Sequence, residues 1–352
     1  MSGPRTLAQR YRQFAEFEAA GTSPLYERIA IALSESAEAL RAIGTAPARS
    51  RNPALVLAAL HDLALAGRAP ALAAAYAAGD AAPAETAAIS TLLQRTDAVV
   101  AISVRRRPRS DVTGRCAVLY PAIAEAAHRV GAASVGLIDV GCSAGLNLNV
   151  DRVGITYGDG RRLGDPTSPV QFAASIVGDR PVPTRGIPEV VARIGVDRDP
   201  LDVTDADDVR WLRACVPPDQ PERAARLDAE LALLATAPPV LLRGNPVEVL
   251  PDAVARVPPD ALPVVTTTWA LSRFPVETRR RFLDRLEEAA AGREVAWVSG
   301  EGVGVAPSIP TLGDRPASGH SIIGIAVLDG SARAPEAVGR CWSRGRLLSW
   351  LI

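Results

Sequence analysis

The first 130 residues carry apolar positions at helical spacing. Apolar side chains recur three or four positions apart, at Phe14, Phe17, Leu25, Ile29 and Leu33, which predicts amphipathic helices. A further helix should begin at Asn52-Pro53, a capping residue followed by proline, and end at Gly67. Similar patterns predict helices over residues 70–78, 84–102 and 116–130. We therefore expect an all-helical domain over residues 1–130.

After Gly131 the pattern changes to short β-rich runs that alternate with helical segments. This alternation is typical of a parallel sheet with crossover helices. The expected strands are residues 135–140, 193–197, 240–243, 262–268 and 294–299. Two final β runs flank a turn at residues 343–345, which predicts an antiparallel hairpin. The second domain is thus expected to be α/β over residues 131–352, with a Gly-, Pro- and Asp-rich insertion at residues 153–192.

Composition narrows the chemistry. All 39 basic residues are arginine, and they balance 39 acidic residues. Without lysine there is no Walker-type phosphate loop, no Schiff base and no pyridoxal chemistry. Zero net charge argues against a dedicated nucleic-acid binder. Any histidine-dependent mechanism must use one of three residues, His61, His128 or His320.

The cysteines and the chain start favour a soluble cytoplasmic protein. The four cysteines stand far apart without metal-ligand spacing, at Cys116, Cys142, Cys215 and Cys341, which is typical of thiols in a reducing compartment and predicts no metal site. The first residues carry charges where a signal peptide needs an apolar stretch, and no apolar run is long enough for a membrane span. The expected partner is a small molecule, and a monomer and a homodimer both stay open.

The segment Val135–Asn147 is the most informative part of the chain. An expected strand is followed by a turn between Gly141 and Gly145, and a helix is expected from about Leu146. Glycines let the backbone approach a ligand closely, and the free amides of a helix N-terminus point into the same space. The segment therefore predicts a nucleotide pocket.

Several interpretations of this turn stay open. Asp139, the glycines and Asn147 resemble the first motif of class I S-adenosylmethionine (SAM) methyltransferases. A dinucleotide site would need G-x-G-x-x-G, but Ser143 occupies the middle glycine position. The same residues also satisfy G-x-S-x-G, the nucleophile elbow of an α/β-hydrolase, with His320 as the only downstream histidine. A strand-to-helix turn without any ligand is the remaining alternative.

The whole chain resembles the bacterial family of domain of unknown function 2332. The resemblance rests on LYERIA, TGRCAVLYPAIA, IDVGCSAGLNLNVDR and RGNPVEVLP. Together with the methyltransferase motif it implies a Rossmann-like methyltransferase sheet with a C-terminal antiparallel hairpin. It also implies S-adenosyl-L-methionine as cofactor and a helical cap, residues 1–130, over the carboxyl ends of the strands. The resemblance says more about fold and cofactor than about substrate.

The methyltransferase resemblance assigns cofactor contacts residue by residue. At the first turn these are Asp139, Gly141, Cys142, Ser143, Gly145 and Asn147. Asp197 or Asp199, after the second strand, would accept hydrogen bonds from the ribose, although the insertion widens the usual gap of about 20 residues. Asn245 would read the adenine or cap a helix. Thr268 ends the strand that faces the methyl donor.

The acceptor side has fewer candidates. Trp269 would wall the sulfonium through a cation–π contact or belong to the core. Glu301 and His320 are the candidates for orienting or deprotonating an acceptor. Asp111 and Arg115, in a charged loop of the cap, would bind an anionic substrate or face solvent. The sequence thus predicts a SAM-dependent methyltransferase for a small molecule, with a serine hydrolase or a non-catalytic SAM-binding or interaction protein as alternatives.

Overall fold

The chain forms two units that interleave in sequence. The computed structural model describes residues 6–109, 114–329 and 334–352. One unit comprises Met1–Asp111 and Asp205–Asp228, and the other comprises Val112–Thr204 and Ala229–Ile352. The first is helical and the second is mixed α/β.

The helical unit is built around α4 (Pro53–Leu65), which is buried along almost its whole length. A helix that is apolar on every side is typical of a position surrounded by other helices. Asn52 caps α4 as predicted, because its side chain accepts a hydrogen bond from the amide of Leu55 at 3.2 Å. The other elements are α1 (Leu7–Phe14), the π-helix η1 (Ala15–Ala19), α2 (Pro24–Glu35), α3 (Ala37–Gly44), the 3-10 helix η2 (Ala48–Ser50), α5 (Pro70–Ala78), α6 (Ala81–Gln94) and α7 (Thr96–Arg105).

Helix α9 (Ala206–Ala214) belongs to the helical unit although it follows several strands in the chain. Its Trp211 is fully buried and donates from Nε1 to the carbonyl of Arg107 at 3.0 Å. Arg210 Nε donates to the carboxylate of Asp62 at 2.9 Å. The predicted boundary at residue 130 therefore differs from the observed division, because long-range packing of this kind leaves no local pattern in the sequence.

The α/β unit contains an 11-stranded sheet with the order β3-β2-β4-β11-β10-β9-β8-β7-β1-β5-β6. Five neighbouring strands run parallel, β6 (Val240–Arg243), β5 (Glu189–Asp197), β1 (Ser134–Val140), β7 (Leu262–Thr268) and β8 (Val295–Gly302). Each of the five lies where the apolar pattern predicts a strand. The mostly parallel α/β class is therefore confirmed.

The rest of the sheet is partly antiparallel. After β8 come β9 (Ser321–Leu328), β10 (Glu336–Trp342) and β11 (Leu347–Trp350), each antiparallel to the strand before it. The predicted hairpin across the 3-10 helix η6 (Ser343–Gly345) is confirmed. The segment at 153–192 forms three short strands that were not predicted, β2 (Gly154–Tyr157), β3 (Arg162–Gly164) and β4 (Gln171–Ile176). Strand β4 pairs with β11 and so extends the same sheet.

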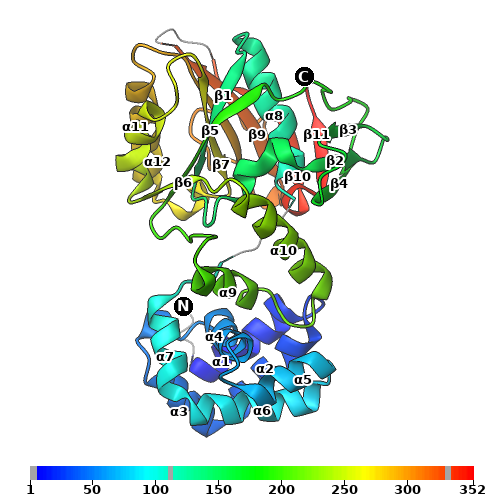
Figure 1. Ribbon diagram of the computed structural model, residues 1–352, viewed down its shortest axis with the longest axis vertical. Helices are drawn as coiled ribbons and strands as arrows, with labels where there is room; N and C mark the ends of the chain where they lie inside the picture. The colour runs from blue at the N-terminus through cyan, green and yellow to red at the C-terminus, as the bar shows by residue number, and fades with distance from the viewer. Residues whose placement is uncertain (1–5, 110–113, 330–333) are drawn as a thin grey trace. The chain divides into compact units, whose positions relative to one another are not determined.

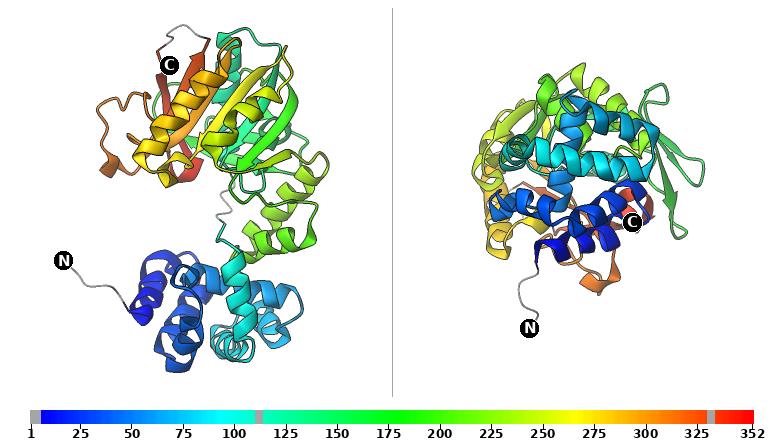
Figure 2. Two further views of the ribbon diagram at one scale, coloured as in Figure 1. Left: turned by 90° about the vertical axis from the view of Figure 1, so that its left-hand side faces the viewer. Right: turned by 90° about the horizontal axis from the view of Figure 1, so that it is seen from below.

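Helices cover both faces of the parallel strands (Figure 1). Helix α8 (Cys116–Arg129) packs on one face, together with alternate strand residues such as Leu137 and Val264. Helices α11 (Pro246–Ala255) and α12 (Val276–Ala289) pack on the other, together with Ile138 and Val265, and this face is turned toward the viewer in Figure 2, left. Because both faces are covered, β1, β7 and β8 are buried along almost their whole length and are mainly apolar, with polar residues concentrated toward their carboxyl ends. Helix α10 (Pro221–Ala235) begins in the helical unit and ends in the α/β unit.

Within the described ranges, no single helix is long and apolar enough to cross a bilayer. Two sharply bent pairs reach the required length and composition only when each pair is taken together, Pro53–Leu65 with Pro70–Ala78 and Ala81–Gln94 with Thr96–Arg105.

We expect Trp211→Ala to destabilise the helical unit by about 3–5 kcal/mol, because it removes a fully buried aromatic side chain and leaves a cavity. Phe17→Ala is the matched control, since Phe17 is 78% exposed and its truncation should stay within about 0.5 kcal/mol. Urea denaturation followed by circular dichroism measures both. Equal stabilities of the two variants would contradict the placement of α9 in this unit.

Candidate functional site

The strand order identifies one position on the sheet where a ligand site is expected. Strands β5 and β6, which follow β1 in the chain, lie on one side of it in the sheet. The later strands β7 and β8 lie on its other side. In open α/β sheets, ligands bind outside the carboxyl ends of the strands where the order reverses in this way. Here that point lies between β1 and β7. The glycine turn follows β1 directly at this point.

The glycine turn has a backbone that requires its glycines. Gly141 and Gly145 have left-handed conformations, with φ of 76° and 86°. The amide of Gly141 donates to the carbonyl of Val196 in β5 at 2.7 Å, so the turn starts beside the neighbouring strand. A Cβ atom on Gly141 would lie 3.1 Å from the Cβ of Ala270, which follows β7. Ser143 is left-handed too, with φ of 56°, which is uncommon for a residue other than glycine.

Asp197 joins the end of β5 to this turn. One of its carboxylate oxygens accepts a hydrogen bond from the amide of Ser143 at 3.0 Å, and the other accepts from the amide of Asp199 at 2.9 Å. Asp199 forms an ion pair with Arg243 at 2.6 Å. The predicted ribose residue therefore lies beside the glycine turn, and both of its oxygens hold backbone amides.

The helix expected from Leu146 is the 3-10 helix η3 (Leu146–Arg152), which has a non-helical residue at Asn149. Arg193 of β5 holds this segment, because it donates to the carbonyl of Leu148 and pairs with both oxygens of Asp151 at 2.7 Å. These contacts favour a tight turn over a continuous α-helix. The amides available to a ligand here belong to the turn itself.

Asp139, the penultimate residue of β1, is almost completely buried at 1% exposure. Thr266 Oγ1 donates to its carboxylate at 2.9 Å and Asn147 Nδ2 donates at 3.1 Å. Burial raises the pKa of Asp139 to about 6, although Arg115 and these two hydrogen bonds favour the ionised form. The structure thus brings the predicted residues Asp139 and Asn147 together and gives the site a buried carboxyl group with a raised pKa.

Arg115 crosses from the start of α8 to the end of β7. Its Nη1 donates to the carbonyl of Thr268 at 2.9 Å and to Thr268 Oγ1 at 3.2 Å. Its guanidinium lies 5.1 Å from the ring centroid of Trp269. Arg115 therefore belongs to the α/β unit and not to the helical domain in which the sequence placed it. Asp111, its predicted partner, lies outside the described residues.

Glu301, the candidate for orienting or deprotonating an acceptor, is fully buried at the end of β8. Its Oε1 accepts hydrogen bonds from the amides of Ala270 and Leu271 at 2.9 and 3.0 Å, at the start of the 3-10 helix η4 (Leu271–Arg273). Burial raises the pKa of Glu301, and these amides oppose the shift. The contacts make Glu301 the residue that holds the turn after β7.

His320 lies apart from the glycine turn. Its Nε2 is 2.9 Å from the carboxylate of Asp314, which also accepts from Arg340 Nε at 2.6 Å. The His320 ring lies 5.4 Å from the ring of Trp342. Strand β9 is the third strand from β1, a separation of about 14 Å at the usual strand spacing. The contacts of His320 fasten the segment that joins β8 to β9, which also carries the 3-10 helix η5 (Pro316–Ser318).

Two of the remaining predicted residues have structural partners. Asn245 caps α11, since its side chain accepts from the amide of Val247 at 3.3 Å and donates to Glu248 at 3.0 Å. Cys142 is buried against β5, where a Cβ atom on Gly195 would lie 2.7 Å from its Sγ. Within the described ranges, no group of three or more histidine, cysteine or acidic side chains could hold a metal ion.

Sequence reasoning assigned no role to three buried polar residues. Thr266 Oγ1 donates to Asp139, Ser321 Oγ accepts from Trp269 Nε1 at 2.8 Å, and Glu230 is a buried carboxyl that adds to the effect of burial in raising the pKa of the Cys116 thiol. Thr266 had a signal, because a run of threonines ends an otherwise apolar buried strand. Ser321 and Glu230 had none, since each meets its partner from a distant part of the chain.

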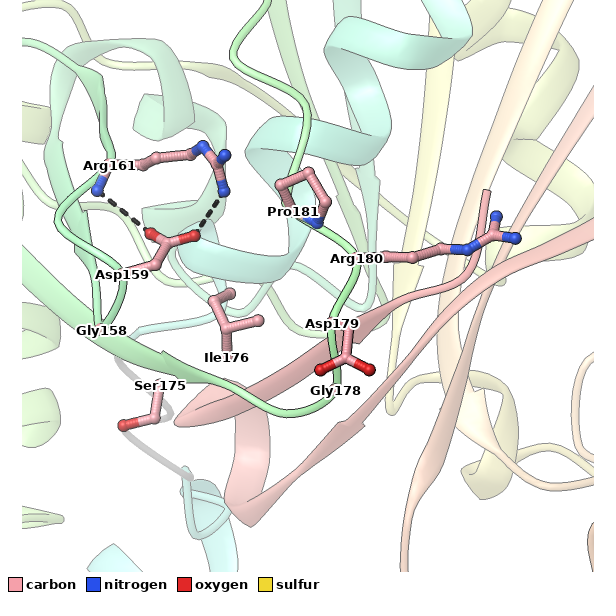
Figure 3. A pocket seen from close by; sticks show the side chains of 9 residues that line it. All are labelled: Gly158, Asp159, Arg161, Ser175, Ile176, Gly178, Asp179, Arg180 and Pro181. Carbon is pink, nitrogen blue, oxygen red and sulfur yellow. Dashed lines mark hydrogen bonds and ion pairs between the residues drawn. The ribbon is translucent and has the colours of Figure 1, made fainter.

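A surface pocket of about 660 Å³ lies in the insertion and contains none of the predicted residues (Figure 3). Asp159 pairs with Arg161 across one side of it. Arg180 extends away toward the C-terminal strand, where it donates to the carbonyl of Leu351. Both arginines of the pocket thus have partners, and we place the candidate site at the glycine turn.

Comparison with known proteins identifies a family. No curated protein and no solved structure matches the chain. The bacterial family described as "Uncharacterized protein conserved in bacteria (DUF2332)" matches residues 8–350. The match covers nearly the whole sequence and both units, and the chain therefore belongs to this family.

Proposed function

We propose that the protein is a SAM-dependent methyltransferase that acts on a small molecule, with its α/β unit as a Rossmann-like methyltransferase domain. The observation that carries the proposal is the glycine turn at the point where the strand order reverses. There Gly141, Ser143 and Gly145 all adopt left-handed conformations, and Asp197 of the next strand binds the turn. Glycines in this arrangement allow the close backbone approach that a nucleotide requires.

The charge at the turn supports a cationic ligand. Two carboxylates, Asp139 and Asp197, lie at adjacent strand ends, and Arg115 supplies the positive charge that acts on Asp139. Asp139 lies on a strand that is paired on both sides, so its position is set before a ligand binds. SAM carries a sulfonium and an amino group, both positive, and a preorganised negative site favours it over an anionic nucleotide.

The proposal also fits what methyl transfer demands of a protein. Transfer from a sulfonium needs the acceptor atom in line with the S–CH₃ bond, and positioning supplies most of the acceleration. The rigid groups at the ends of β1, β5 and β7 suit such positioning. We assign Asp139, Asn147, Ser143, Asp197 and the two glycines to cofactor binding, and Arg115 and Trp269 to the acceptor side.

One observation favours a serine hydrolase, namely the left-handed backbone of Ser143 with φ of 56°, which is typical of a nucleophile on a sharp turn. A hydrolase also needs a histidine within hydrogen-bond reach of that serine. His320 instead contacts Asp314, and β9, the strand that directly follows His320, lies about 14 Å from β1 in the sheet. His128 is exposed in α8, whose C-terminal end precedes β1. These positions favour the methyltransferase.

We expect S-adenosylhomocysteine, the product, to bind with a Kd of about micromolar order and to raise the melting temperature. Asp139→Asn keeps the shape but removes the charge, and should weaken binding by about 1.5–3 kcal/mol. Gly141→Val should abolish binding, because a side chain there meets Ala270 and the backbone is left-handed. Calorimetric titration measures the affinity of the wild type and of both variants, and thermal denaturation with and without S-adenosylhomocysteine measures the melting temperature.

Ser143→Ala is the matched control, since the turn uses the Ser143 amide and the variant should lose at most about 0.5–1.5 kcal/mol of binding. A fluorophosphonate probe should not label the wild-type protein. No heat with either SAM or its product would contradict the proposal, and labelling of Ser143 would favour the hydrolase. Binding without transfer to any acceptor would indicate the non-catalytic SAM-binding protein.

Binding should also depend on pH through Asp139. SAM, the cationic ligand, should prefer the ionised carboxylate of Asp139, whose pKa in the free protein is about 6. Affinity should therefore fall by up to about tenfold per pH unit below that value and level off above about pH 7. Asp139→Asn should give a flat profile in calorimetric titrations across this range. An equally steep profile in Asp139→Asn would rule out Asp139 as the titrating group.

The stability of the free protein should change with pH in the opposite direction. Asp139 has a pKa above the value of about 3.9 expected in the unfolded chain, so the folded state binds more protons between about pH 4 and pH 6. The contribution of Asp139 to the free energy of unfolding is therefore fully present below about pH 4 and is lost as pH rises through 6. Urea denaturation of the wild type and Asp139→Asn isolates this contribution.

A further inference from the structure

Trp269 has an unusual backbone for a large side chain. Its φ is 51°, in the left-handed region that bulky residues rarely adopt. Such a conformation persists only where the surroundings impose it, and it is concentrated at functional sites. Trp269 therefore calls for a reason beyond packing.

The surroundings hold Trp269 from several directions. Its amide donates to the carbonyl of Gly300 in β8 at 3.0 Å, and its indole N–H donates to Ser321 Oγ in β9 at 2.8 Å. Glu301 fixes the next two amides of the turn. Arg115 lies 5.1 Å from the ring centroid. Three separate segments thus fix the orientation of one side chain that is only half-buried.

The turn that carries Trp269 touches the glycine turn. Strands β1 and β7 are neighbours, and Val140 is paired with Thr267 in their register. The residue that follows β1, Gly141, approaches Ala270 so closely that a Cβ atom on Gly141 would lie 3.1 Å from the Ala270 Cβ. Trp269 therefore lies between the proposed cofactor turn and the ends of β8 and β9.

We propose that Trp269 is a rigid platform on which the acceptor substrate stacks a flat aromatic ring, so that the substrate class is aromatic; this inference rests on the proposed methyltransferase function. Arg115 already acts as the cation on this indole. A second cation at the same ring would be repelled, which favours a neutral or anionic aromatic ring over the sulfonium of the donor. We therefore assign Trp269 to the binding of the acceptor substrate.

Binding of matched ligands tests the platform without requiring turnover. We would measure 2-naphthol and its fully saturated analogue, decahydro-2-naphthol, by ligand-observed NMR in the presence of saturating S-adenosylhomocysteine. Wild-type protein should bind the aromatic compound about three- to tenfold more tightly than the saturated one, the range expected for an aromatic pair. Trp269→Leu should remove this preference, and Trp269→Phe should keep most of it.

Trp342→Leu is the matched control, since Trp342 is also half-buried but contacts His320 rather than Arg115. It should bind both compounds as the wild type does. Equal affinity for the two compounds, no binding of either, or the same loss in Trp342→Leu would overturn the platform. Failure of S-adenosylhomocysteine to bind would instead overturn the methyltransferase proposal, and the two failures are therefore distinguishable.

Discussion

The buried carboxylate of Asp139 is the interaction on which the site depends. It fastens the end of β1 to β7 through Thr266, and it fastens the glycine turn to both through Asn147. A carboxylate buried this deeply is unfavourable unless donors and a cation compensate it. Arg115 supplies that charge, and the same guanidinium reaches the end of β7 and the ring of Trp269. Arg115, which compensates the charge of Asp139, thus links the proposed cofactor turn to the proposed acceptor platform.

The parallel strands could be predicted from the sequence because each contains a run of mainly apolar residues that is bounded by polar or glycine-rich segments. Where these conditions fail, the prediction fails too. In β2, β3 and β4 there is no such run: a glycine begins β2 and ends β3, and exposed positions alternate with buried ones in β4. The division of the chain into two units could not be predicted from the sequence either. Trp211 joins the helical unit through contacts to residues about a hundred positions earlier, and no local period encodes them.

The site residues divide in the same way. Asp139, Asn147, Ser143 and Asp197 come together at adjacent strand ends, since a strand end and a turn define their positions. For Glu301 the sequence predicts a place at the end of a strand, and for His320 a place before a β run, but not the groups that each side chain reaches. Glu301 turns inward to two backbone amides, and His320 turns to Asp314. The end of a strand fixes where the backbone of a residue lies, whereas the groups that its side chain contacts decide its role.

The carboxylates at the carboxyl ends of the parallel strands differ in their hydrogen-bond donors. This difference separates roles that the sequence cannot distinguish. Asp197 accepts one backbone amide on each oxygen, and Glu301 accepts two on one oxygen; such amides cannot move without moving the chain. Asp139 instead accepts from two side chains, Thr266 and Asn147, which can rotate. A carboxylate held by backbone amides serves the architecture of a turn, while one held by side chains can exchange a donor for a ligand. By this criterion Asp139, and not the more exposed acidic residues nearby, is the group best suited to respond when a cofactor arrives.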